Sequence, residues 1–202
     1  YAVRSLAGVI EQVGLLTRDH ASDRMVSEAY RHYQEGSAPE TCHAFRSAYG
    51  HAETPIEMIG VFDTVKSLGF RAPFVVRWAE VKHGFHDHTL GMNVRRGFHA
   101  LALDETREAF SPVLWDCPPD HQGQVEQVWF RGTHGDVGGQ LTGKLEARPL
   151  SNIPLVWMVE RLEVCGLPLP HGWRTELPVD PDAPSVGNWR GWGKYFLARK
   201  KR

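Results

Sequence analysis

The sequence predicts an α/β fold, with a mostly parallel sheet and flanking helices. Two apolar runs, at residues 56–62 and 125–130, indicate buried strands because each is short and rich in β-forming residues. Amphipathic patterns precede the first run and follow the second, an order typical of a sheet that helices cover. These helices are expected at residues 1–16, 22–35, 40–49 and 151–165. Since two strands cannot form such a sheet alone, we expect its other strands outside these 202 residues.

Residues at the ends of the helices support these assignments. Ser22 is a good N-cap for the second helix, and Gly36 ends it. Ser151 is expected to cap the last helix, which Gly166 ends. The proline-rich stretch that follows has no periodicity, so residues 168–202 are expected to form a loop-rich tail.

The chain between the two predicted strands is harder to assign. Residues 71–95 fit either a strand or a helix, and residues 97–103 are expected to form a short buried helix or turn. We expect residues 1–202 to be the C-terminal part of one domain, in which residues 70–124 form an insertion or cap beside the functional site. Aromatic side chains of this cap would line an apolar wall beside that site: Phe74, Trp78, Phe85 and Phe98.

Composition excludes several classes of protein. Hydrophobic residues make up 42% and charged residues 23% of the chain, as is usual for a globular protein rather than a disordered one. The 23 Lys and Arg residues nearly balance the 24 Asp and Glu residues, so no overall charge favours nucleic acid. No apolar run reaches the ~18 residues that a transmembrane segment needs. The 3 cysteines are widely spaced and indicate neither disulfides nor a zinc module, and we expect no cofactor.

Polar residues follow both predicted strands. Asp63 comes directly after the first strand, and His134 lies in a glycine-rich loop after the second. In open α/β sheets, ligands bind outside the carboxyl ends of the strands. An Asp followed later by a His matches the order of the triad acid and base in an α/β-hydrolase, where the carboxylate orients the imidazole that accepts the nucleophile's proton. Two structural alternatives stay open: Asp63 as a turn cap, and His134 as a loop residue bonded to backbone carbonyls.

Other functions also fit parts of the sequence. One group of side chains has the types that bind zinc, which would make the protein a metal-dependent hydrolase. The group consists of His83, His86, Asp87 and His88, and the metal-dependent hydrolase would use its three histidines together with Asp136. A polar surface turn is the structural alternative for this group. A third alternative is a non-catalytic remnant of the fold that binds a partner, because a fold alone does not confer chemistry. Asp104, Glu105 and Arg107 are expected to form a buried ion-pair cluster that holds a loop.

Several longer stretches resemble one family in the correct order. They are IGVFDTVKSLG at 59–69, FHALALDETREAFSPVLW at 98–115, EQVWFRGTHGDVGG at 126–139 and LSNIPLVWMVERLEVCGL at 150–167. Together with the opening helix they make the chain similar to the type VI secretion phospholipase-effector family, bacterial lipases with an α/β-hydrolase fold. The resemblance implies that Asp63, in an Asp-Thr-Val motif, is the triad acid. It likewise implies that His134, in a His-x-Asp-Val-Gly-Gly motif, is the base.

The nucleophile of that family is a serine in a Gly-Phe-Ser-Arg-Gly-Ala elbow. A helix that begins with an aromatic residue follows this elbow directly. The resemblance therefore implies a serine a few residues before Tyr1. No Gly-x-Ser-x-Gly occurs in the 202 residues, and Ser5 lacks the glycine two positions before it. The family's early Asp-Gly-Thr motif is absent as well. By itself, the chain is not expected to be a competent esterase.

The resemblance also implies partners and a location. The substrate would be a phospholipid or another acyl ester, and a secretion-apparatus or immunity protein would be a partner. The protein would be made in the bacterial cytoplasm and delivered by type VI secretion to a target cell. Residues 189–202 are basic and contain tryptophan, which fits either peripheral contact with a membrane or a solvated helix end.

Overall fold

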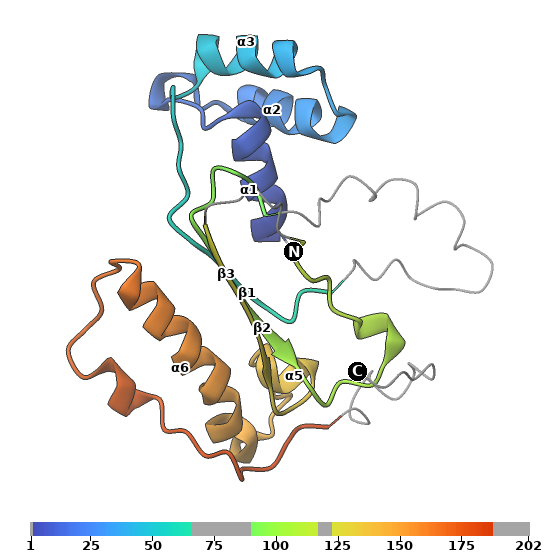
Figure 1. Cartoon of the computed structure of the whole chain (residues 1–202), viewed down its shortest axis with the longest axis vertical. Helices are drawn as coiled ribbons and strands as arrows, with labels where there is room; N and C mark the ends of the chain where they lie inside the picture. Colours follow the sequence, from blue (N-terminus) through green and yellow to red (C-terminus); the bar gives the residue numbers. More distant parts are fainter. Residues whose placement is uncertain (1, 66–89, 117–122, 188–202) are drawn as a thin grey trace. The chain divides into compact units, whose positions relative to one another are not determined.

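The computed structural model describes residues 2–65, 90–116 and 123–187 (Figure 1). The chain divides into two compact units, which we call the helical unit and the sheet unit. The helical unit comprises Tyr1–Ile59, Gly69–Arg96 and Trp115–Gln124, and the sheet unit comprises Gly60–Leu68, Gly97–Leu114 and Val125–Arg202. Among the described residues, none of the helices combines the length and the apolar character needed to span a membrane.

Three helices build the helical unit: α1 (Ala2–Val13), α2 (Asp23–Glu35) and α3 (Pro39–Tyr49). A short 3-10 turn, η1 (Arg18–His20), lies between the first two. Buried side chains from all three helices form one cluster, made of Val13, Ala29, Tyr33 and Phe45. Gly8 allows α1 to approach α2 closely, because a Cβ atom at this position would lie 2.8 Å from the ring of Tyr33.

The predicted ends of α2 are confirmed. The Ser22 hydroxyl accepts a hydrogen bond from the backbone N–H of Met25 at 3.4 Å, and Gly36 takes the left-handed conformation with φ 61°. The other two helices differ slightly from the prediction, because α1 ends at Val13 and α3 begins one residue earlier, at Pro39.

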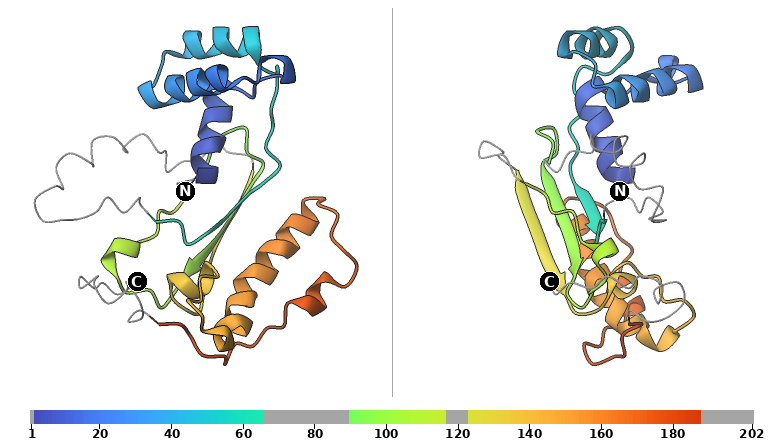
Figure 2. Two further views of the ribbon diagram at one scale, coloured as in Figure 1. Left: turned by 180° about the vertical axis from the view of Figure 1, so that it is seen from behind. Right: turned by 90° about the vertical axis from the view of Figure 1, so that its right-hand side faces the viewer.

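The sheet unit is built on three parallel strands in the order β1-β2-β3 (Figure 2). Their bounds are Ile59–Phe62, Arg96–Ala102 and Gln124–Phe130. The expectation that residues 97–103 form a short helix or turn is wrong, since this stretch is almost entirely the middle strand. Strand β2 lies between the two strands that the sequence predicts, so those two strands are not direct neighbours.

Burial explains why the sequence of β2 does not show the pattern of a strand. Every residue from Gly97 to Ala102 is buried, so the strand shows no alternation of polar and apolar residues. Ala100 and Ala102 are 0% exposed, and alanine favours helices more than strands when it is judged by propensity alone. Tertiary packing overrides that preference here.

Helix α6 (Arg148–Val164) packs on the sheet. Trp157 on α6 contacts the rings of Phe98 on β2 and Phe130 on β3 edge-on, with centroid distances of 6.1 and 5.4 Å. The helix starts three residues before the predicted Ser151, which is buried within it instead of capping it. The 3-10 turn η4 (Leu145–Ala147) leads directly into α6, so no side-chain cap is needed there.

The remaining described elements are short. They are η3 (Glu108–Phe110), α5 (His134–Val137) and η5 (Trp173–Glu176). The rest of residues 168–187 has no regular structure, as predicted for this part of the tail. Arg131 holds this stretch to the sheet unit by donating hydrogen bonds to the carbonyls of Pro181 and Ala183. Within the stretch expected to form a cap, Arg96–Ala102 is the middle strand of the sheet. Residues 70–89 and 117–122 lie outside the described residues, and a cap formed by them stays a prediction.

We predict that replacing the most buried aromatic residue of β2 destabilises the sheet unit strongly. Phe98 is 1% exposed, so Phe98→Ala should lower the free energy of unfolding by about 3–5 kcal/mol. Leu103→Ala is the control, because Leu103 is 51% exposed and its loss should change the free energy by less than ~0.5 kcal/mol. Urea unfolding followed by tryptophan fluorescence measures both, and equal effects would contradict the assignment of β2 to the core.

Candidate active site

Asp63 follows β1 at the carboxyl end of the sheet. Its side chain is 0% exposed, and its backbone has a φ of 37°, in the left-handed region that Asp tolerates better than most residues. Its backbone N–H donates to the carbonyl of Ala100 at 2.7 Å, which continues the pairing with β2. Its Oδ1 accepts a hydrogen bond from the backbone N–H of Ala102 at 2.9 Å. The last residue of the middle strand thus orients the carboxylate.

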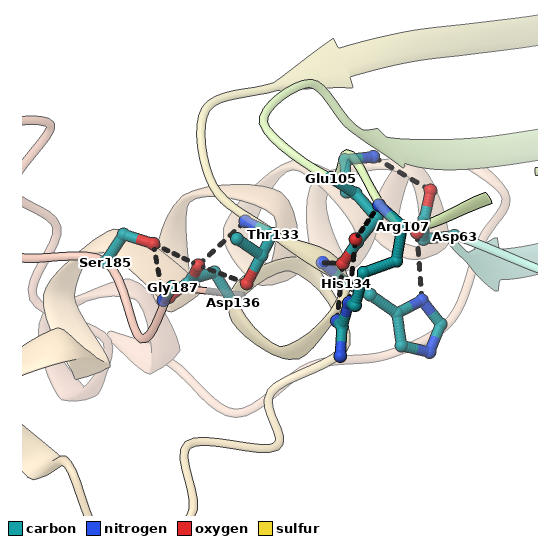
Figure 3. A network of polar contacts seen from close by, with 9 residues as sticks. Asp63, Glu105, Arg107, Thr133, His134, Asp136, Ser185 and Gly187 are labelled. Atoms are coloured by element: carbon teal, nitrogen blue, oxygen red, sulfur yellow. Dashed lines mark hydrogen bonds and ion pairs between the residues drawn. The ribbon is translucent and has the colours of Figure 1, made fainter. Parts of the chain in front are cut away.

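His134 is the first residue of α5, the short helix that follows β3 after a tight loop. Its Nδ1 lies 2.9 Å from Oδ2 of Asp63 (Figure 3). Because a carboxylate is only an acceptor, this contact places the proton of the neutral imidazole on Nδ1 and leaves a lone pair on Nε2. The His134 side chain is 26% exposed, and no described residue forms a hydrogen bond with its Nε2. The predicted contact between the two side chains is present; their catalytic role stays a prediction.

Three successive backbone amides of the loop before α5 each donate to a carboxylate. Gly132 donates to Oδ2 of Asp104 at 2.7 Å, Thr133 to Oδ2 of Asp136 at 2.7 Å, and His134 to Oε2 of Glu105 at 3.3 Å. Gly132 is required here, because its φ is 117° and a Cβ atom would lie 2.6 Å from Cβ of Asp136. The loop is therefore well constrained despite its many glycines.

The Asp136 carboxylate is saturated by donors from the protein. Besides the amide of Thr133, Oδ2 accepts from the hydroxyls of Thr133 and Ser185 at 2.8 and 2.6 Å, and Oδ1 accepts from the amide of Val186 at 2.8 Å. This arrangement suits a structural role better than the metal-ligand role considered for Asp136. The other candidate ligands, at positions 83 to 88, lie outside the described residues. Within the described part of the chain, no group of three metal-ligand side chains comes together.

Of the three residues expected to form a buried ion-pair cluster, Glu105 and Arg107 form an ion pair, whereas Asp104 is exposed and accepts the backbone N–H of Gly132. Oε1 of Glu105 accepts from the backbone N–H and from Nε of Arg107, both at 2.8 Å, and Oε2 accepts from Nη2 at 2.5 Å. Burial raises the pKa of Glu105, but the hydrogen bonds and charge of Arg107 and the amide of His134 outweigh it. The pKa of this carboxyl group therefore lies below its ordinary value of 4.5.

Sequence reasoning missed two side chains beside the pair. The ring of Phe110 lies 4.9 Å from the ring of His134, measured between centroids. Nε2 of His99 accepts from the backbone N–H of Thr64 at 3.1 Å, just after Asp63. A histidine within an apolar strand was a visible signal for the second contact, whereas no pattern marked Phe110.

One residue that was expected to line the apolar wall lies in the core of the sheet unit instead. Phe98 is 1% exposed and packs against Trp157 of α6, so it does not line a surface open to substrate. The other three aromatic residues of that wall, at positions 74, 78 and 85, lie outside the described residues.

The sheet and the site together define an α/β protein with a carboxylate–imidazole pair at the carboxyl end of its parallel strands. The family model for the type VI secretion system phospholipase effector, Tle1-like, catalytic domain matches residues 1–161, and the chain belongs to this family. Comparisons with curated proteins and with solved structures gave no significant match. Membership indicates a lipase-like hydrolase with a lipid substrate and the role of an effector in type VI secretion.

We predict that the Glu105–Arg107 pair contributes to stability in a pH-dependent way. Because the pKa of Glu105 is lowered in the folded state, the contribution is full above the unfolded pKa and is lost as pH falls through the folded pKa. Glu105→Gln should lower the free energy of unfolding by about 3–5 kcal/mol at neutral pH, since it leaves Arg107 buried without its partner.

Urea unfolding of wild type and variant between neutral and acidic pH measures this effect. The difference between them should shrink as pH falls below the ordinary value of 4.5. Glu108→Gln is the matched control, because Glu108 is an exposed carboxylate in the next turn. A difference that does not change with pH would contradict the prediction.

Proposed function

We propose that this chain supplies the acid and the general base of a serine hydrolase that cleaves phospholipids or related acyl esters. The observation that carries the proposal is the 2.9 Å contact between the buried Asp63 carboxylate and Nδ1 of His134. Family membership supports a lipid substrate.

In the proposed reaction, Nε2 of His134 takes the proton of a serine hydroxyl while the serine oxygen bonds to the acyl carbon of the ester. The carbonyl electrons move onto oxygen and then return, breaking the bond to the leaving alcohol, which takes the proton from the imidazolium. Water then cleaves the acyl-serine by the same steps, releasing the fatty acid. Asp63 holds the imidazole in the correct tautomer and stabilises the imidazolium that forms twice in each cycle.

The proposed nucleophile is the serine of the family's elbow, in a segment that would precede Tyr1. The 202 residues contain no Gly-x-Ser-x-Gly, which supports a serine from another segment. Tests of activity therefore need a protein that includes that elbow.

We further propose that the protein is synthesised in the bacterial cytoplasm and delivered to a target cell, and that an immunity protein is its partner.

We predict that both members of the pair are needed for ester hydrolysis. His134→Ala should lower kcat/KM by at least ~1000-fold, because it removes the general base. Asp63→Asn should lower it by about 1000- to 10,000-fold, because the amide no longer holds the productive tautomer. Release of fatty acid from phospholipid vesicles measures the rate. Two exposed residues of the sheet unit serve as controls, His171→Ala and Asp182→Asn, and both should match wild type. Full activity in His134→Ala would refute the mechanism.

A serine-directed fluorophosphonate probe should label the elbow serine, and labelling should slow strongly in His134→Ala because the serine is no longer activated. Mass spectrometry of the labelled peptide identifies the serine. Rapid hydrolysis without labelling, together with a stoichiometric metal ion, would favour a metal-dependent hydrolase. An intact elbow that neither reacts nor hydrolyses ester would favour a binding protein.

A further inference from the structure

Three side chains form a stack that ends on the imidazole of His134. The guanidinium carbon of Arg107 lies 4.0 Å from the centre of the Phe110 ring, and that ring lies 4.9 Å from the imidazole at an angle of 51°. Both distances are within the range in which such pairs attract, about 6 Å for a cation over a ring and about 4.5–7 Å for two rings.

The far end of the stack is fixed by a buried carboxylate. Glu105 is 0% exposed and holds both Nε and Nη2 of Arg107, so the planar guanidinium cannot rotate without breaking this fork. The same carboxylate accepts the backbone N–H of His134 at 3.3 Å. Glu105 therefore holds the backbone of His134 by a direct hydrogen bond. It also holds Arg107, which contacts the Phe110 ring that lies against the imidazole.

The hydrogen bond to Asp63 does not by itself determine the plane of the imidazole. A hydrogen bond tolerates departures from linearity of about 30°, so the ring can tilt while its Nδ1 stays bonded. Such a tilt moves Nε2, the other ring nitrogen, out of line with the serine proton that it would accept. A ring packed against the imidazole removes this freedom.

We infer that Phe110 is a positioning residue that sets the plane of the His134 imidazole, and that the Glu105–Arg107 pair holds Phe110 in place. The inference rests on the proposed function, because it assigns the direction of Nε2 to a contact made by neither substrate nor nucleophile. It also makes η3 (Glu108–Phe110) part of the support of the site.

The test uses substitutions at Phe110 in the protein that includes the elbow. Phe110→Ala should lower kcat by about 10- to 100-fold with KM changed by less than ~3-fold, because the general base is misaligned while substrate binding is kept. Phe110→Leu keeps apolar volume without a flat ring and should lower kcat in the same direction. Phe110→Tyr keeps an aromatic ring at this position, and its kcat should stay within ~2-fold of wild type.

A second readout does not depend on activity. In a ¹⁵N–¹H NMR spectrum of the ring nitrogens, the signals of His134 should shift and broaden in Phe110→Ala and Phe110→Leu and return in Phe110→Tyr. Arg107→Lys keeps the charge opposite Glu105 but not the planar fork, and it should shift the same signals. The matched control is Leu114→Ala, an apolar truncation at a residue that is 42% exposed, and it should change neither kcat nor the spectrum.

The outcomes separate this inference from the proposed function. Unchanged kcat and His134 signals in both Phe110→Ala and Phe110→Leu would overturn it. A raised KM with unchanged kcat would also overturn it, because Phe110 would then bind substrate. If the wild type hydrolyses no ester but its His134 signals still respond to Phe110, the proposed function fails and the positioning role stands. If Phe110→Ala unfolds, Phe110→Leu and Phe110→Tyr decide.

Discussion

The Asp63 carboxylate is completely buried, and its need for hydrogen-bond donors links the ends of all three strands. A carboxylate taken out of water costs several kcal/mol unless donors replace the lost hydration. The donors are the amide of Ala102 at the end of β2 and the imidazole of His134 in the turn after β3. Because parallel strands end at the same edge of a sheet, one side chain after β1 can reach both.

The loop that carries His134 depends on the same physical principle. Asp104, Glu105 and Asp136 each accept one of three successive backbone amides, and each bond satisfies a donor that would otherwise need water. Charged acceptors make these bonds stronger than ordinary backbone pairs. The position of the imidazole is therefore set by the backbone as well as by its own hydrogen bond.

All these groups belong to the sheet unit, so the contact between Asp63 and His134 lies within one compact part of the chain. The proposed function requires precise placement of this pair, because errors of about 1 Å in the alignment of reacting groups can cost about 100-fold in rate. Around the imidazole, whose side chain is 26% exposed, lie the Glu105–Arg107 ion pair, the ring of Phe110 and three further carboxylates. The family assignment indicates a lipase-like hydrolase, and a buried carboxylate bonded to an imidazole is compatible with that class of enzyme.

Much of the protein was determined by local sequence alone. Ser22 and Gly36 fix the ends of α2 by capping, and the apolar runs before Asp63 and His134 predicted β1 and β3, because these signals act over a few residues. Only the tertiary structure decided the rest. The strand β2 is buried on both faces and shows no periodicity, so pairing with its neighbours rather than propensity made it a strand. Similarly, the contact of Phe110 with His134 joins residues on separate elements, and no pattern along the chain records which rings meet once the sheet has formed.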